Sequence, residues 1–535
     1  MHRFRLLLAL LLVGAFVVAS STALAQEPGG RIVVALADEP PSLDPHTSEA
    51  WFTFTVTAQL YDQLVVRDIE TREIAPGLAT SWTSNEDGTE WVLTLREGVT
   101  FHDGTPFDAE AVRFSFMRII DPMTRSPAAA PLLDDNLERV DVIDDTTVRF
   151  VMRRPFAGFL DALTQSYGGL TVVSPAAVER YGEDFGQNPV GTGPFMFREW
   201  STGSHITLVR NPDYAWGPEA LFGRSDAAYL DEIRLEFVAE HPVRSAMLQR
   251  GAADVIWRVP EPDADMLDRA PDTQVIRIVR PGTGSMMQIN ARKAPTDDVL
   301  VRRALLHLID FRAINNIVYA GVPEDASSVV SPVTPGYRAD VDRYVLYPID
   351  VEAASALLDE AGWTLNASGL REKDGQVLSL VHICFPGPAC QVGEVMQAQV
   401  AAAGIVLDIQ AMGQPANVQA TQRGEHNLRP IGWGGSDAAK LLRFLYHPEN
   451  AGSGWNFTFY DGEAFADLLN RASEELDEGR RFELVGQVED YVFEQALSIP
   501  TFYYTWLIGT RADVQGVFFD PANALPMFVN THLVD

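Results

Sequence analysis

Short hydrophobic runs alternate with polar segments along most of the chain, and two periodicities recur within them. Residues 90–101, EWVLTLREGVTF, alternate from one side chain to the next, which is typical of a strand with one face in the core. Residues 109–120, AEAVRFSFMRII, place Val112, Phe116 and Ile119 on one face at helical spacing. The pattern therefore predicts half-buried strands together with amphipathic helices.

Strands and helices are expected to alternate in both halves of the chain. The predicted strands are residues 31–36, 90–101, 141–152, 204–214, 229–238, 253–260, 285–290, 377–384, 405–413 and 498–510. The predicted helices are residues 52–66, 109–120, 174–182, 241–251, 297–310, 350–363, 390–404 and 479–496. This alternation predicts an α/β sheet in each half.

The N-terminal 25 residues have a pattern of their own. A basic start, MHRFR, precedes an apolar run and the small residues STALA, which is the signature of a secretory signal peptide cleaved near Ala25. No later segment of the sequence reaches the length of apolar chain that a membrane span needs. We therefore expect a soluble protein of the periplasm or the extracellular space, without a membrane anchor.

Composition narrows the choice of partners. The 535 residues are 46% hydrophobic, which is enough for sizeable cores, and the net charge is −32, or −34 after loss of Arg3 and Arg5. Such a charge argues against nucleic acid as a partner. Cys384 and Cys390, in CFPGPAC, are the cysteines of the sequence, and an oxidising compartment favours a small disulfide loop between them.

The segment FHDGTPFDAE, residues 101–110, resembles a reactive cluster at first sight. Asp103 with Gly104 is a favoured turn pair, and Asp108 directly precedes an apolar-periodic run, as a helix N-cap does. Phe107 and Val112 have the spacing of a hydrophobic staple across that cap. Structural roles thus explain every feature of the segment except its histidine, His102. We assign the segment no catalytic or metal-binding role.

Catalytic motifs are missing from the rest of the sequence as well. It contains no HExxH, GxSxG, P-loop, CxxC or GxGxxG pattern, and its other histidines are scattered singly. We therefore predict a protein that is not an enzyme and that has no cofactor and no metal site.

An ordered set of motifs resembles one family. SLDP, YDQL, PGLATSW, FHDGTPFDAEAVRFSFMR, GTGPF, NPDY, VRRALLHLID, LLDEAGW and IPTFYY occur in the order found in the family 5 extracellular solute-binding proteins of ABC importers. That family includes dipeptide, oligopeptide and nickel-binding receptors. The resemblance runs from about residue 31 to the C-terminus.

The resemblance implies a bilobed periplasmic-binding-protein fold of type II. Lobe I would comprise residues 26–283, with an extra subdomain at about 76–190, and residues 501–535 would return to it. Lobe II would comprise residues 284–500, with hinges near SMMQIN and ALSIPTFYY. A ligand held between the lobes would favour the closed state, which a membrane permease receives. The receptor is expected to be a monomer.

The resemblance also points to residues that select the ligand. Peptide-binding members carry an aspartate three residues after a Gly-Trp pair, where it binds the α-ammonium of the ligand. Here GWGGSDAAK has Trp433 but places Ser436 at that position and Asp437 one residue later. Either Asp437 replaces the missing acid or the ligand is not held by an α-ammonium.

Further ligand-binding candidates follow from their positions after strands and in loops. The loop HTSEAW follows the first strand, where open α/β sheets bind ligands, and it offers Thr47, Ser48 and Trp51. The loop CFPGPAC follows a strand of lobe II in the same way, although it lacks the arginine that dipeptide receptors offer to a peptide carboxylate. Asn456 is a candidate beside Trp455, which is either a cleft or a core residue.

Several functions stay open at this point. A receptor for short peptides or peptide-like molecules is slightly favoured. The same receptor for an oligosaccharide, an opine or a metal chelate is the alternative, and a regulatory binding protein without a permease is another. A secreted hydrolase is the weakest hypothesis, because the sequence lacks the catalytic constellation it needs.

Overall fold

The computed structural model describes residues 29–48, 50–127, 129–133, 136–164 and 169–534. The predicted signal peptide and its cleavage site lie outside these described residues. Within them, none of the helices is both long enough and apolar enough to span a membrane.

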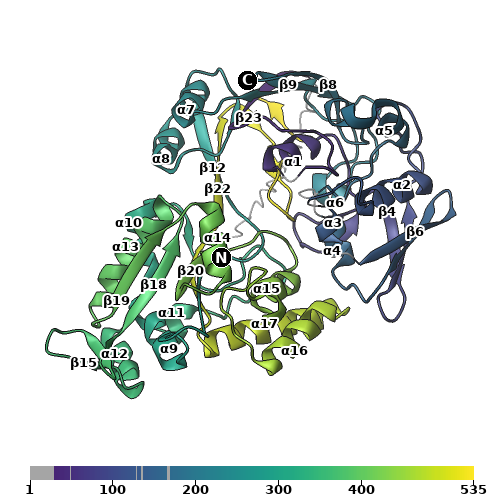
Figure 1. Cartoon of the computed structure of the whole chain (residues 1–535). Coiled ribbons are helices and arrows are strands. Elements are labelled where there is room, and N and C mark those ends of the chain that lie inside the picture. The colour runs from purple at the N-terminus through teal and green to yellow at the C-terminus, as the bar shows by residue number, and fades with distance from the viewer. Residues whose placement is uncertain (1–28, 49, 128, 134–135, 165–168, 535) are drawn as a thin grey trace, which may run out of the picture.

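Among the described residues, two large mixed sheets form the two main bodies of the molecule (Figure 1). The first contains, in spatial order, β12 (Thr273–Val279), β22 (Thr505–Arg511), β11 (Val255–Trp257), β1 (Arg31–Leu36), β10 (Glu232–Phe237), β9 (His205–Arg210) and β8 (Phe195–Ser201). The second contains β14 (Glu324–Asp325), β21 (Ser498–Tyr503), β13 (Ser285–Ile289), β20 (Leu428–Ile431), β18 (Ser379–Cys384) and β19 (Val406–Ala411). We call the bodies built on them lobe I and lobe II.

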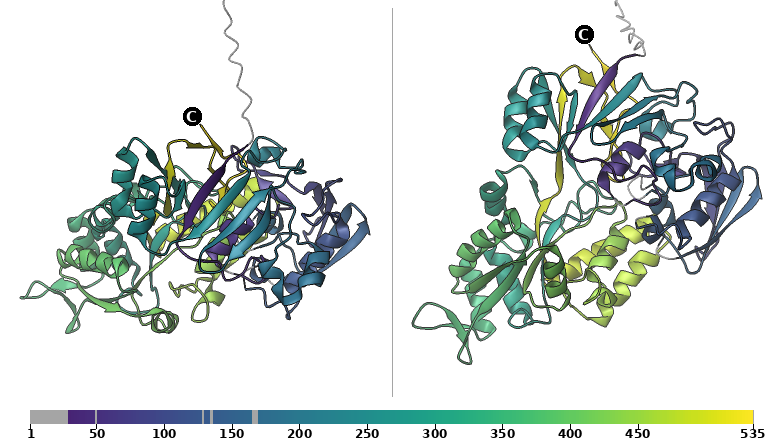
Figure 2. Two further views of the ribbon diagram at one scale, coloured as in Figure 1. Left: turned by 90° about the horizontal axis from the view of Figure 1, so that it is seen from above. Right: turned by 45° about the horizontal axis from the view of Figure 1, so that its top comes forward.

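A smaller antiparallel sheet lies at the side of lobe I and forms a subdomain. Its strands, in order, are β4 (Ala79–Ser84), β5 (Glu90–Leu95), β7 (Thr147–Met152) and β6 (Leu137–Asp144). Minor ribbons are formed by β2 (Val65–Arg67) with β3 (Ile74–Pro76), β23 (Val514–Gln515) with β26 (His532–Leu533), β24 (Phe518–Phe519) with β25 (Pro526–Met527), and β15 (Thr364–Leu365), β16 (Arg371–Lys373) and β17 (Gln376–Val377). The last of these projects from lobe II (Figure 2).

Helices cover the sheets of both lobes. Lobe I and its subdomain carry α1 (Trp51–Thr57), α2 (Ala109–Ile120), α3 (Ala129–Leu132), α4 (Phe159–Leu163), α5 (Pro175–Tyr181), the 3₁₀ helix Gly182–Gln187, α6 (Glu219–Phe222), α7 (His241–Gln249) and α8 (Glu261–Arg269). Lobe II carries α9 (Val299–Leu308), α10 (Phe311–Tyr319), α11 (Arg343–Leu346), α12 (Val351–Glu360), α13 (Pro388–Ala401), α14 (Gln414–Gln422), α15 (Ala438–Tyr446), the 3₁₀ helix Pro448–Asn450, α16 (Glu463–Glu474) and α17 (Glu478–Glu494).

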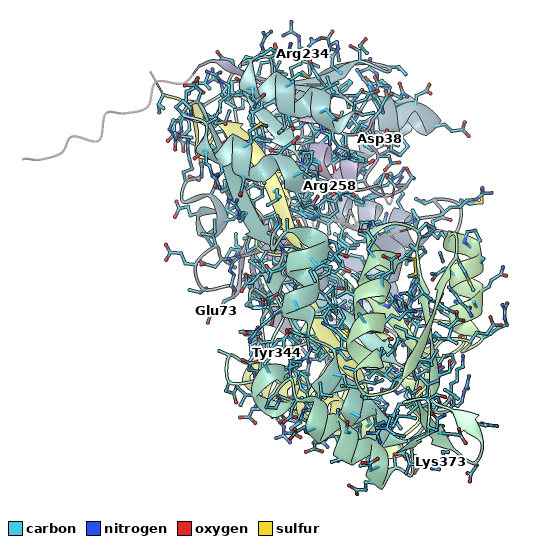
Figure 3. All side chains as sticks on the ribbon, turned by 90° about the vertical axis from the view of Figure 1, so that its left-hand side faces the viewer. Asp38, Glu73, Arg234, Arg258, Tyr344 and Lys373 are labelled. Carbon is cyan, nitrogen blue, oxygen red and sulfur yellow. A yellow bond between two sulfur atoms is a disulfide. The ribbon has the colours of Figure 1, made fainter. Side chains whose placement is uncertain are left out.

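The chain passes between the lobes at neighbouring points. Residues 280–284 join β12 to β13, and Tyr504 joins β21 to β22, so that each connection links a strand of one large sheet to a strand of the other. The Arg280 N–H donates to the carbonyl oxygen of Tyr504 at 2.8 Å, which ties the connections together. The yellow C-terminal strands make this crossing visible in Figure 2. In Figure 3 the labelled Arg258 lies in lobe I, and Tyr344 lies in lobe II.

Several predicted elements differ from the structure. The predicted strand 141–152 comprises the end of β6, a turn at residues 145–146 and β7, and the predicted strand 90–101 ends at Leu95. The apolar run 498–510, predicted as one strand, is split at Tyr504 into β21 and β22, which belong to different lobes. The predicted helix 52–66 ends at Thr57, and the chain then turns and enters β2. A continuous apolar run shows that residues are buried, but it does not show which core buries them.

The structure explains the turn glycine, the helix cap and the histidine of FHDGTPFDAE. Gly104 has a φ of 82°, and Asp108 accepts the N–H of Ala111 at 2.9 Å as the N-cap of α2. His102, for which the sequence offered no role, donates from Nε2 to the carbonyl of Gly193 at 3.0 Å and accepts the N–H of Gly191 at Nδ1. Burial lowers the pKa of His102 to about 4, so the ring is neutral at physiological pH.

A buried acid in lobe II predicts a pH-dependent stability. Glu489 on α17 is fully buried, and Ser328 donates a hydrogen bond to it. Burial raises its pKa to about 7, against about 4.3 in an unfolded chain. The folded state therefore holds a proton that the unfolded state has released between these pH values. Stability falls by roughly 3 to 4 kcal/mol as the pH rises through this window.

Replacement of this acid is expected to remove that loss. Glu489→Gln keeps the shape of the side chain and the acceptor for Ser328. The melting temperature of the variant minus that of wild type should therefore increase by several degrees between pH 5 and pH 8. Glu494→Gln, at an exposed position of the same helix, is the control. A constant difference between Glu489→Gln and wild type across this range would contradict the assignment.

Candidate functional site

The first connection between the lobes packs against the segment GWGG of lobe II. The Thr283 N–H donates to the Trp433 carbonyl, and the Trp433 N–H donates to Thr283 Oγ1, both at 2.9 Å. Gly282 has a φ of 127°, and a Cβ there would lie 2.2 Å from the Trp433 carbonyl oxygen. Only glycine therefore permits this approach, which fixes the position of Trp433 at the crossing.

A cavity of about 240 Å³ lies at this crossing, and we call it the interlobe cavity. Lobe I contributes Trp51 and Asn523, the connection contributes Arg280 and Pro281, and lobe II contributes the backbone of Gly432 to Gly435. Because both lobes and the connection supply its walls, its shape depends on their relative position.

Arg280 is the charged residue of the interlobe cavity. Its guanidinium carbon lies 4.6 Å from the ring centroid of Trp506, 5.5 Å from that of Trp51 and 5.8 Å from that of Tyr504. These distances allow cation–π attraction. A Cβ on Gly434 would lie 2.5 Å from Arg280 Nη2, so the second glycine of GWGG leaves room for the arginine.

Another cavity, of about 310 Å³, adjoins the first within lobe II, and we call it the lobe II cavity. Gly432 and Trp433 line both cavities, which makes them neighbours. Its other walls come from β13, α10, β20, β21 and the start of α13, together with Tyr504, Trp455 and Phe385. Aromatic rings form much of this wall, which is typical of a small-molecule site.

Arg429 on β20 is the charged residue of the lobe II cavity. It is 4% exposed, and its guanidinium carbon lies 4.4 Å from the ring centroid of Phe457 and 5.8 Å from that of Phe385. Nη1 donates to the carbonyl of Pro430 at 2.6 Å. Burial lowers the pKa of Arg429 to about 10, which still leaves it charged at neutral pH.

The structure divides the residues predicted from GWGGSDAAK. Trp433 is 38% exposed and lines both cavities. Ser436 instead donates a hydrogen bond at 2.6 Å to Asp161 of α4, across the space between the lobes. Asp437 accepts the N–H of Lys440 at 3.1 Å and so is the N-cap of α15. Oδ1 of Asp437 is therefore used in a helix cap. The alternative in which Asp437 replaces the missing acid requires the same carboxylate to bind the ammonium of the ligand.

Trp51 and Trp455 line the cavities, but the other predicted loop residues do not. Ser48 Oγ lies 2.8 Å from Thr53 Oγ1 and accepts the N–H of Ala50, so it fixes the start of α1. Thr47 is exposed. Asn456 donates from its amide nitrogen to the carbonyls of Tyr446 and His447, and its amide oxygen accepts the N–H of Thr458. Both ends of its amide are therefore occupied. We therefore leave Thr47, Ser48 and Asn456 out of the candidate site.

Sequence reasoning missed Arg280, Arg429 and Tyr504. Arg429 interrupts an otherwise apolar strand directly before the Gly-Trp pair, and a charged residue at such a position was a usable signal. Arg280 and Tyr504 gave no local signal, because their importance comes from the crossing of two segments more than 200 residues apart.

The chemistry that the site offers is binding. Its side chains supply guanidinium groups, hydroxyls, amides and aromatic faces. Among the described residues, no three His, Cys, Asp or Glu side chains lie close enough together to hold a metal ion.

A comparison with known families decides the class of protein. Residues 73–453 match the model of the bacterial extracellular solute-binding proteins, family 5, which covers well over half of the chain. The chain belongs to this family. The family predicted from the ordered motifs is therefore confirmed, and the protein is a solute-binding receptor of the ABC-importer type.

Individual relatives agree with this assignment. The glutathione-binding protein GsiB of Escherichia coli O1:K1 is 28% identical over 482 residues, which is 88% of each chain. The periplasmic binding protein DppA of Helicobacter pylori, solved with the peptide STSA, is 26% identical with a TM-score of 0.72, over 95% of this chain and 99% of its own. HbpA2 of Haemophilus parasuis is 24% identical with a TM-score of 0.83, over 94% and 100%. They confirm the predicted bilobed α/β fold of the receptor, while the exact residue boundaries of its lobes stay predictions.

Cys384 and Cys390 form a disulfide in the structure of the solute-binding protein, and this bond closes the loop that carries Phe385. The bond joins residues six positions apart, and closing so short a loop stabilises the fold by about 2 kcal/mol. We expect a thiol reagent to label the denatured protein only after reduction. The double variant Cys384→Ser/Cys390→Ser should unfold several degrees below the oxidised wild type. Its own unfolding temperature should not change when reductant is added. Labelling without reduction would show that the bond is absent.

Proposed function

We propose that this receptor captures a short peptide or a peptide-like molecule in the interlobe and lobe II cavities and presents it to an ABC permease. The observation that carries the proposal is the interlobe cavity itself, because Trp51 of lobe I, Arg280 of the connection and Trp433 of lobe II line one space. A ligand there contacts both lobes, so it favours their closed arrangement. The relatives GsiB, which binds glutathione, and DppA, solved with a peptide, support a peptide-like ligand.

Contacts outside the cavities support a closing motion. Ser436 reaches Asp161 of lobe I, Arg481 donates to the carbonyl of Ala157 at 3.3 Å, and the Lys440 ammonium lies 5.4 Å from the ring centroid of Phe156. All of them join the α15 and α17 side of lobe II to the region of α4. The short connections at residues 280–284 and Tyr504 would act as hinges, since few bonds need to change there.

The remaining attributes belong to the same proposal. The receptor acts in the periplasm as a monomer, without a cofactor, without nucleic acid as a partner and without enzymatic activity. Binding and release between rigid lobes require no covalent chemistry.

Ligand identity is tested by thermal-shift screening of the mature protein with di- to pentapeptides and reduced glutathione. We expect a rise in melting temperature of several degrees with at least one of them at millimolar concentration. A parallel plate holds oligosaccharides, opines and iron chelates. A rise in melting temperature with one of these and none with any peptide would show that the ligand belongs to that class instead. Native mass spectrometry of the purified protein identifies a ligand retained during purification.

The closing motion is tested at Ser436. Loss of its hydrogen bond to the Asp161 carboxylate should weaken the closed state by about 1.5 to 3 kcal/mol, while Asp161 keeps its ion pair with Arg67. Small-angle scattering of Ser436→Ala should give a larger radius of gyration than wild type, and its ligand affinity should fall about tenfold or more. Ser368→Ala, in an exposed turn of lobe II, is the control. Equal scattering and equal affinity of Ser436→Ala and wild type would show that this contact does not govern closure.

A further inference from the structure

We propose that the lobe II cavity is a subsite for a carboxylate group carried on an apolar stem, with Arg429 as its cationic partner. The proposal rests on the proposed function and makes it more specific, because it names the chemical class of ligand. It assigns specificity to a residue outside the Gly-Trp motif.

The first argument is the charge of Arg429 in a place where charge is unfavourable. Its side chain is 4% exposed and lies against Phe457 and Phe385. Within the described part of the chain no carboxylate forms an ion pair with it, and its Nε lacks a hydrogen-bond partner. Buried arginines are ordinarily paired with a carboxylate, so an arginine that lines a cavity without one indicates a site for an anion.

The second argument is that other buried polar atoms of the same cavity are also unsatisfied. Asn315, 1% exposed, uses its amide nitrogen to bind Asp325 and Thr501, but its Oδ1 has no partner in the structure. The Oγ1 of Thr501, 3% exposed, has none either. Both residues line the cavity together with Arg429. Native proteins leave few buried polar atoms unpaired. The Thr501 hydroxyl can donate to a carboxylate, whereas the Asn315 oxygen can only accept and so suits an N–H group of the same ligand.

The apolar walls decide what must accompany the carboxylate. Phe385, Trp433, Trp455 and Phe502 line the same space, so a hydrated inorganic anion would lose more solvation than the wall returns. A carboxylate at the end of a methylene or aromatic stem fits both the guanidinium and the rings. Phe385 lies next to Cys384, so the disulfide loop holds one side of the subsite.

The lining of both cavities argues against a strong ammonium site. Among the described residues that line them, the charged ones are Arg280 and Arg429, and none is Asp or Glu. The ligand class that these walls favour is therefore an acidic peptide-like molecule. Its carboxylate could be the C-terminus or an acidic side chain, and the test below distinguishes these sources.

The test compares ligands that differ by one charge. Isothermal titration uses Ala-Ala-Glu, Ala-Ala-Gln and their C-terminal amides, together with 3-phenylpropionate and 3-phenylpropionamide observed by saturation-transfer NMR. We expect wild type to bind the carboxylate form at least tenfold more tightly than the matched amide. Preference for Glu over Gln identifies a side-chain carboxylate, and preference for the free C-terminus over its amide identifies the terminal one.

Variants of Arg429 assign that preference to the residue. Arg429→Gln should lose the discrimination between acid and amide while keeping its affinity for the neutral partner within about threefold, and Arg429→Lys should restore part of the discrimination. Arg292→Gln, which removes an exposed arginine stacked on Phe459 elsewhere in lobe II, is the matched control and should behave as wild type. Melting curves of each variant confirm that it folds.

Each outcome bears on a separate statement. If no peptide binds but 3-phenylpropionate binds in an Arg429-dependent manner, the peptide ligand is wrong and the subsite stands. If peptides bind and acid and amide are equal, or if Arg429→Gln keeps the preference, the subsite is wrong and the receptor function stands. If neither the peptides nor 3-phenylpropionate bind, both statements are overturned.

Discussion

The structure depends on one constraint, which is that the chain crosses between its two large sheets at neighbouring points. The Arg280 N–H and the Tyr504 carbonyl join these crossings by one backbone hydrogen bond. Because so little backbone connects the lobes, contacts that form and break on either side decide their relative position. The same crossing brings Arg280 over the rings of Trp51 and Trp506 and requires glycine at residue 282. The candidate site and the proposed hinge are therefore consequences of one arrangement.

The charge inside the cavities is opposite to that of the whole protein. The chain carries a net charge of −32, yet the charged side chains that line the cavities, among the described residues, are Arg280 and Arg429. Surface charge is screened beyond about 8 Å at physiological salt, whereas a guanidinium within an apolar wall acts on a contacting group with little screening. We therefore expect ligand selection to follow the local arginines, while the acidic surface favours solubility.

In the segment GWGGSDAAK, the polar residues that follow the glycines form hydrogen bonds with the protein itself. Ser436 donates to Asp161 of the opposite lobe, and Asp437 caps α15. Asp161 is already neutralised by Arg67, so it can accept the hydroxyl without bringing a free charge into the space between the lobes. The position to which the resemblance assigns an ammonium-binding acid is thus, in this structure, a contact between the lobes.

Periodicity and ordered motifs were sufficient to predict the α/β class, the family, the cap at Asp108 and most elements, because these follow from residues close together in the chain. The sequence also indicated Trp51 and Trp433 as site residues. The predicted residues Ser48 and Asn456 use their polar groups in hydrogen bonds within the protein, with Thr53 and with the carbonyl of Tyr446. Arg429 was missed although a charged residue in an apolar strand was a usable signal, because only the fold places it in the wall of a cavity. The resemblance already implied a return to lobe I near residue 501, but only the tertiary structure placed the crossing at Tyr504. It alone also showed that the guanidinium of Arg429, which has no ion-pair partner among the described residues, lines a cavity. Both depend on contacts between distant segments, and such contacts have no local pattern.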